Sequence, residues 1–164
     1  MEINNIGSQP KPADVDEITT VPKNVEVVSG ETIVFDSKIH DEIIFGRNPA
    51  LTYEERPADI VTGVLPVKLV GTSSSDTSKQ QFGIDRSPNG VFTITNYSKT
   101  ESIHVDGQTK SGDLGPNKHE VIAQNTQGMQ RVKVSWGRGH FEVSVNGVGS
   151  GSDNNQIDFT WNIK

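Results

Sequence analysis

The sequence contains no cysteine, and this absence excludes several kinds of site at once. A disulfide framework, a thiolate metal centre and a cysteine nucleophile all require cysteine side chains. Long apolar runs are also missing, since no stretch of about 18 apolar residues occurs and a transmembrane helix needs one. Apolar residues make up only 32% of the 164 residues, which is enough for one thin hydrophobic core.

Positive charge is scarce as well. The chain carries 15 Lys and Arg against 21 Asp and Glu, so its net charge is −6. A nucleic-acid binder that relies on phosphate neutralisation needs a basic surface, and this class of protein is not expected. The first residues, Met1 to Asn5, lack the basic region and the apolar stretch of a signal peptide. The compartment stays unknown, with the cytoplasm and non-classical export both open.

Helical periodicity is missing from the chain, and alternation of period two takes its place. Short runs rich in β-branched and aromatic residues lie between clusters of Gly, Asn, Asp and Ser, which is typical of strands joined by turns. Turn signals recur roughly every 8–12 residues, as in β-sandwiches. We therefore predict an all-β, antiparallel sandwich of jelly-roll or immunoglobulin-like topology. The predicted strands are residues 24–28, 32–35, 41–45, 64–70, 81–85, 91–95, 102–105, 120–122, 130–136, 140–145 and 157–163.

The N-terminal segment, residues 1–23, differs from the rest of the chain. It contains Pro10, Pro12 and Pro22 and shows little apolar pattern. Proline blocks helix formation and removes the donors of a strand ladder, so extended backbone is favoured. The sequence predicts an extended or flexible arm followed by one sandwich domain, residues 24–164.

Two features inside the domain carry local predictions. Pro66 interrupts the strand predicted over residues 64–70, which favours an edge position or a bulge. The segment from Gly71 to Lys79 includes three consecutive serines and predicts an exposed polar connection.

Nothing in the sequence is typical of an enzyme. The four histidines are scattered, and only His104 and Asp106 share one face of a strand, at a spacing that a metal pair can use. No nucleophile elbow, phosphate-binding glycine loop or zinc-binding helix motif is present. We predict a non-enzymatic protein without catalytic residues.

The C-terminal part carries one family resemblance. The strand from Phe141 to Asn146 precedes a polar loop with Asp153, Asn154 and Asn155, and an alternating strand closes the chain. This ending resembles bacterial calcium-dependent galactose-binding jelly-roll lectins. The resemblance implies that Asn146 and the three loop residues bind the ligand, and that Asp153 and Asn154 help to hold calcium, which prefers oxygen ligands.

The family's pattern is incomplete here, and two aromatic residues extend the hypothesis. Gly147 stands where the lectins carry an acidic residue, and the segment 57–71 is similar to their Gly-x-Leu strand and glycine turn. Trp136 is a candidate platform for a sugar ring, with a place in the core as the alternative. Tyr53, in a polar loop, is a further candidate ligand-binding residue.

A second resemblance runs through the middle of the chain. Ile43 to Arg47 ends in Gly46-Arg47, and the segments 91–98 and 103–107 follow in order. These segments resemble forkhead-associated domains, which read phosphothreonine. The family's Ser-Arg-x-x-His is missing, because its place falls near Val64 to Leu69, which offers no phosphate donor. The resemblance implies a degenerate interaction domain that depends on Arg47 and has lost phosphate recognition.

Three functions stay open. We predict a lectin-like or adhesive binding module that recognises carbohydrate or a protein surface through its end loops, with calcium as the implied cofactor. The first alternative is a structural subunit of a virion, tail or filament, in which the arm joins copies of the chain into an oligomer. The second alternative is the degenerate forkhead-associated interaction domain.

Overall fold

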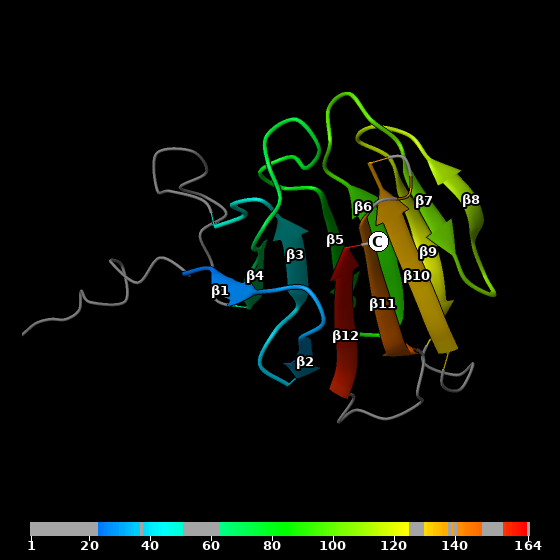
Figure 1. Cartoon of the computed structure of the whole chain (residues 1–164). Coiled ribbons are helices and arrows are strands. Elements are labelled where there is room, and N and C mark those ends of the chain that lie inside the picture. The colour runs from blue at the N-terminus through cyan, green and yellow to red at the C-terminus, as the bar shows by residue number, and fades with distance from the viewer. Residues whose placement is uncertain are drawn as a thin grey trace, which may run out of the picture.

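The predicted all-β sandwich is confirmed by the structure, a computed structural model (Figure 1). It describes residues 23–36, 38–50, 63–124, 130–137, 139, 141–148 and 156–163. These residues form two six-stranded sheets that pack face to face. They include no helix that is long and apolar enough to cross a membrane. The predicted arm, residues 1–23, lies outside the described residues apart from Lys23.

Each sheet draws its strands from distant parts of the chain. Sheet I has the order β1 (Val25–Val27), β4 (Val64–Leu69), β3 (Glu42–Gly46), β5 (Phe82–Arg86), β6 (Val91–Asn96) and β9 (His119–Gln124). Sheet II has the order β2 (Thr32–Asp36), β12 (Gln156–Ile163), β11 (Phe141–Val148), β10 (Gln130–Trp136), β7 (Ile103–Asp106) and β8 (Ser111–Leu114).

Strand β4 departs from the antiparallel pattern, because it runs parallel to both β1 and β3. Parallel neighbours need a long crossover, and residues 47–63 supply it between β3 and β4. Pro66 pairs with Ile44 of β3, whereas β1 pairs only with Val67–Leu69. Strand β4 lies between β1 and β3, so the predicted edge position is wrong. Pro66, which has no N–H donor, fits here because the pairing with β1 begins only at Val67.

The core forms from the inward-facing residues of both sheets. Strands β10 and β11 alternate between buried and partly exposed positions, as period-two strands do when one face is covered. Phe45 of sheet I lies 5.2 Å from Phe159 of sheet II, measured between ring centroids. Such aromatic contacts join the two sheets and bury the largest side chains of the protein.

Candidate functional site

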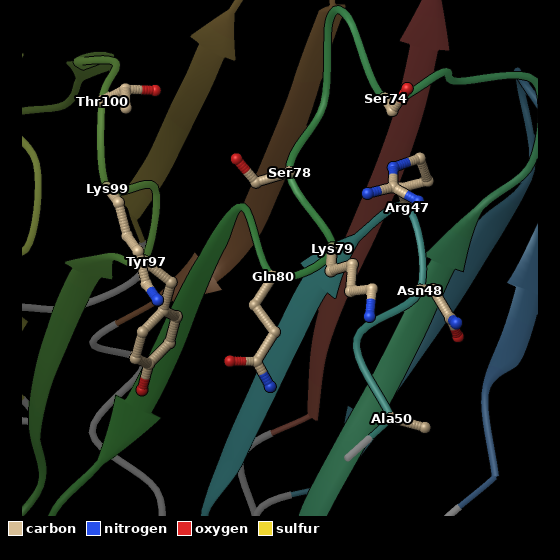
Figure 2. Close-up of a pocket in the computed structure, with 10 residues that line it drawn as sticks. All are labelled: Arg47, Asn48, Ala50, Ser74, Ser78, Lys79, Gln80, Tyr97, Lys99 and Thr100. Carbon is tan, nitrogen blue, oxygen red and sulfur yellow. The ribbon is translucent and has the colours of Figure 1, made fainter. Parts of the chain in front are cut away.

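Three connections between strands enclose an open pocket of about 510 Å³ at one end of the sandwich (Figure 2). They follow β3, β4 and β6. The lining residues are Arg47, Asn48 and Ala50 after β3, Ser74, Ser78, Lys79 and Gln80 after β4, and Tyr97, Lys99 and Thr100 after β6. We call this hollow the cationic pocket.

The charge of the pocket contrasts with that of the whole chain. Arg47, Lys79 and Lys99 line it, and no described lining residue is acidic, although the chain has a net charge of −6. In Figure 2, Ser78 and Lys79 lie between Arg47 on one side and Lys99 on the other. Positive side chains from three separate loops thus gather in one hollow, and such a local field attracts anions.

Arg47 is held in place by the loop that precedes β5. Its main-chain N–H donates to the Ser78 carbonyl oxygen at 3.0 Å, and the N–H of Asn48 donates to the Lys79 carbonyl oxygen at 3.1 Å. The side-chain Nε of Arg47 donates to the Thr77 carbonyl oxygen at 3.1 Å. Among the described residues only Thr77 accepts a hydrogen bond from this guanidinium, so both Nη groups can bind a ligand.

Gly46 permits the close approach of these two loops. A Cβ atom at Gly46 would lie 2.0 Å from the Lys79 carbonyl oxygen and 2.7 Å from its carbon. Both atoms belong to the main chain, so no side-chain rotation can relieve the overlap. Gly46 therefore leaves room for the main chain of Lys79, and the next residue, Arg47, supplies positive charge to the pocket.

The connection after β6 is organised by the side chain of Asn96, which is fully buried. Its Oδ1 accepts from the Ser98 N–H at 2.9 Å, and its Nδ2 donates to the carbonyl oxygens of Glu101 and Leu114, each at 2.9 Å. These hydrogen bonds hold the loop between Ser98 and Glu101 against the buried Asn96 side chain. Lys99 lies in this loop, is exposed, and makes no ion pair with any residue that the structure describes.

Most of the predicted ligand-binding residues fall outside the described part of the chain. These are Tyr53, Asp153, Asn154 and Asn155. Asn146 is described and lies inside β11, between Arg131 of β10 and Asp158 of β12. Strand β11 ends at the opposite end of the sandwich from the cationic pocket (Figure 1).

The interpretation of Trp136 as a sugar platform is wrong, and its alternative place in the core is correct. The side chain is only 3% exposed, and its ring stacks on those of Trp161 and Phe141 at centroid distances of 5.5 and 5.7 Å. Its Nε1 donates to Thr77 Oγ1 at 3.0 Å. Trp136 therefore supports the loop residue whose carbonyl oxygen holds Arg47.

The sequence marks only one of the three cations as a candidate site residue. Arg47 was found through the Gly46-Arg47 pair, whereas Lys79 belonged to a predicted exposed connection and Lys99 carried no signal. That connection is not wholly exposed, because Thr77 within it is 2% exposed. Isolated lysines in polar loops have no pattern that predicts their convergence.

The predicted pair of His104 and Asp106 lies on the outward face of β7, but its histidine has another partner. His104 Nδ1 is 3.0 Å from Asp113 Oδ1 on the neighbouring strand β8. The described residues contain no group of three or more side chains that is suited to hold a metal ion.

Two carboxylates face each other on the outward side of sheet I. Glu42 of β3 pairs with Asp85 of β5, and the Tyr97 hydroxyl donates to Glu42 Oε2 at 2.6 Å. Burial raises the pKa of Asp85 above its ordinary value of 3.8, and the charge of nearby His119 opposes part of this rise. The folded protein therefore binds the Asp85 proton more tightly than the unfolded chain does.

Asp85→Asn is expected to raise the melting temperature at neutral pH. The stability contributed by the protonated carboxyl is fully present below pH 3.8 and is lost as the pH rises through the raised pKa. Asparagine stays neutral, so the gain over wild type should shrink as the pH falls toward 3.8. Thermal unfolding of the variant and the wild type across this pH range measures the gain in melting temperature. Asp158→Asn on β12 is the control for the loss of one negative charge. A gain that is equal at all pH values would contradict the assignment.

No family model, curated protein or solved structure matches this chain. The described residues define the protein as a β-sandwich with a cationic pocket built from three end loops.

Proposed function

We propose that this protein is a non-enzymatic binding module that holds a phosphorylated segment of a partner protein in the cationic pocket. The observation that carries the proposal is the lining of this pocket by Arg47, Lys79 and Lys99 without a described carboxylate. Arg47 and Lys99 come from separate loops, and neither makes an ion pair with a described residue, so their charges can meet an anion in this pocket.

The chemistry of the lining side chains suits a phosphoryl group. Such a group carries a charge of about −2 and three acceptor oxygens at neutral pH. The planar guanidinium of Arg47 can donate two parallel hydrogen bonds to these oxygens, and lysine ammonium groups add charge. Ser78 and Thr100 contribute hydroxyl donors to the same pocket.

The size and the net charge favour a protein segment over other phosphate carriers. A hollow of about 510 Å³ is larger than a phosphoryl group requires, so residues that flank the phosphorylated side chain also fit. A long polyanion such as nucleic acid would meet repulsion from the chain's net charge of −6 beyond the pocket.

The proposed function keeps the interaction-domain hypothesis, but in it the protein still recognises phosphate. Strand β4, Val64–Leu69, carries no phosphate donor, but the loop after it brings Ser74, Ser78 and Lys79 to Arg47. The calcium-lectin and assembly hypotheses stay predictions. They rest mostly on residues 1–22, Tyr53 and residues 149–155, which lie outside the described residues.

Arg47→Ala and Lys99→Ala are expected to weaken the binding of phosphopeptides by about 10- to 100-fold. A hydrogen bond to a charged group contributes about 1.5–3 kcal/mol, and 1.4 kcal/mol corresponds to a tenfold change in affinity. Fluorescence anisotropy with a degenerate phosphothreonine and phosphoserine peptide library measures the loss. The dephosphorylated library gives the baseline.

Lys38→Ala is the matched control, because Lys38 is an exposed cation between the end of β2 and the start of β3, whereas the cationic pocket lies beyond the end of β3. It should bind phosphopeptides like wild type, with and without a calcium chelator. The proposal fails if dephosphorylated peptides bind equally well, or if Lys38→Ala and Arg47→Ala lose the same affinity. A requirement for calcium would instead favour the lectin hypothesis.

A further inference from the structure

The cationic pocket opens into a longer groove. It shares Ser74, Ser78 and Thr100 with a neighbouring hollow of about 450 Å³. This middle hollow in turn shares Glu101 and Gly137 with an outer hollow of about 570 Å³ beside β7 and β8. The three hollows follow one another along the same end of the sandwich, and we call them together the loop groove.

The charge of the loop groove changes sign along its length. The described residues of the middle hollow include Asp76 and Glu101, and those of the outer hollow include Glu101 and Asp113. No Lys or Arg is found among the described residues that line these two hollows. An extended ligand would therefore pass from a positive to a negative environment.

Among the described residues that line the groove, Glu101 is the acidic residue without a partner. Asp76 accepts hydrogen bonds from the N–H and the hydroxyl of Ser73 at 2.8 and 3.0 Å, and Asp113 is 3.0 Å from His104. The carboxylate of Glu101 is exposed and has neither a hydrogen-bond nor an ion-pair partner within the described part of the chain.

The main chain around Glu101 is fixed, although its side chain is exposed. Its N–H donates to Ser98 Oγ at 3.1 Å, and its carbonyl oxygen accepts from Asn96 Nδ2 at 2.9 Å. Lys99, two residues earlier, lines only the cationic pocket, whereas Glu101 lines the other two hollows. One rigid loop therefore separates a positive subsite from a negative one.

We infer that the phosphorylated segment bound by this protein carries a lysine or arginine near its phosphorylated residue, and that Glu101 binds this basic side chain. The inference rests on the proposed function, because the phosphoryl group must first occupy the cationic pocket. Charge complementarity along the groove then selects among phosphorylated partners, since a basic residue meets Glu101 and an acidic residue is repelled.

The test uses the full chain and a phosphothreonine peptide series on a neutral background. A single Arg, Gln or Glu is placed in turn at each of the positions that flank the phosphothreonine, and affinities are measured by fluorescence anisotropy. At one or two positions Arg should bind about two- to fivefold more tightly than Gln, as expected for an ion pair at an exposed site. Glu101→Gln should remove this preference, and Glu101→Lys should reverse it in favour of Glu.

Glu120→Gln is the matched control, because Glu120 is exposed on β9 and does not line the groove. It should leave the preference for Arg unchanged. If phosphopeptides bind through Arg47 but Arg has no advantage at any position, the inference is wrong and the proposed function stands. A preference for Arg that survives in Glu101→Gln also overturns it. If no phosphopeptide binds, both fail.

Discussion

Gly46→Ala is expected to lower the melting temperature by about 6–12 °C and to abolish phosphopeptide binding. The new Cβ atom would lie 2.0 Å from the Lys79 carbonyl oxygen, so the two loops must separate. Overpacking against a fixed neighbour costs about 3 kcal/mol, and each kcal/mol shifts the melting temperature of a chain of this size by about 2–4 °C. The separation also breaks the hydrogen bonds that position Arg47.

Thermal unfolding and the anisotropy assay measure the two effects. Gly115→Ala is the matched control, because a Cβ atom there would meet only Lys118 Cγ, at an ordinary distance of 3.7 Å. It should unfold and bind like wild type. A folded Gly46→Ala protein with unchanged phosphopeptide affinity would show that the approach of the loops does not shape the site.

Asn96→Ala is expected to have an effect of similar size, for a different reason. It leaves the carbonyl oxygens of Glu101 and Leu114 and the N–H of Ser98 without their partner in a buried place. Unpaired buried polar groups cost about 1–3 kcal/mol each, so a loss of about 3 kcal/mol or a fall of about 6–12 °C follows. The freed loop should also weaken phosphopeptide binding, because it carries Lys99.

Asn96→Asp tests whether the side-chain N–H groups of Asn96, and not only its size and shape, hold the loop. The carboxylate keeps the acceptor for Ser98 but turns its second oxygen toward carbonyl oxygens, so it should destabilise at least as strongly as Asn96→Ala. Asn162→Ala, on the outward face of β12, serves as the control in thermal unfolding. If Asn96→Asp unfolds at the wild-type temperature, Asn96 does not act as a donor to the loop.

Local alternation determined most of the strands. The prediction of residues 130–136 coincides with β10, because buried and partly exposed positions alternate along its whole length. Strand β8, Ser111–Leu114, was missed, because its serine, glycine and aspartate have low strand propensity. This strand exists through its pairing with β7, which a local pattern does not contain.

The order of the strands was decided only by the tertiary structure. The alternation in residues 64–70 predicts a strand but not its neighbours, and β4 lies parallel to β1 and β3. Pairing partners are chosen by burial and hydrogen bonding between segments far apart in sequence. A pattern within one segment cannot specify them.

The candidate site, too, was predicted from the sequence only in part. The sequence alone determined an all-β sandwich with an acidic chain and marked Arg47 through the Gly46-Arg47 pair. It also suggested Trp136 as a ligand platform, and the tertiary structure places this ring in the core beneath Thr77. Only the tertiary structure places Arg47, Lys79 and Lys99 around one pocket. It also places Glu101, which lies in the same loop as Lys99, in the neighbouring hollow. The physical reason is that these residues lie on separate loops, which the packing of the two sheets and the buried hydrogen bonds of Asn96 bring to one end of the molecule.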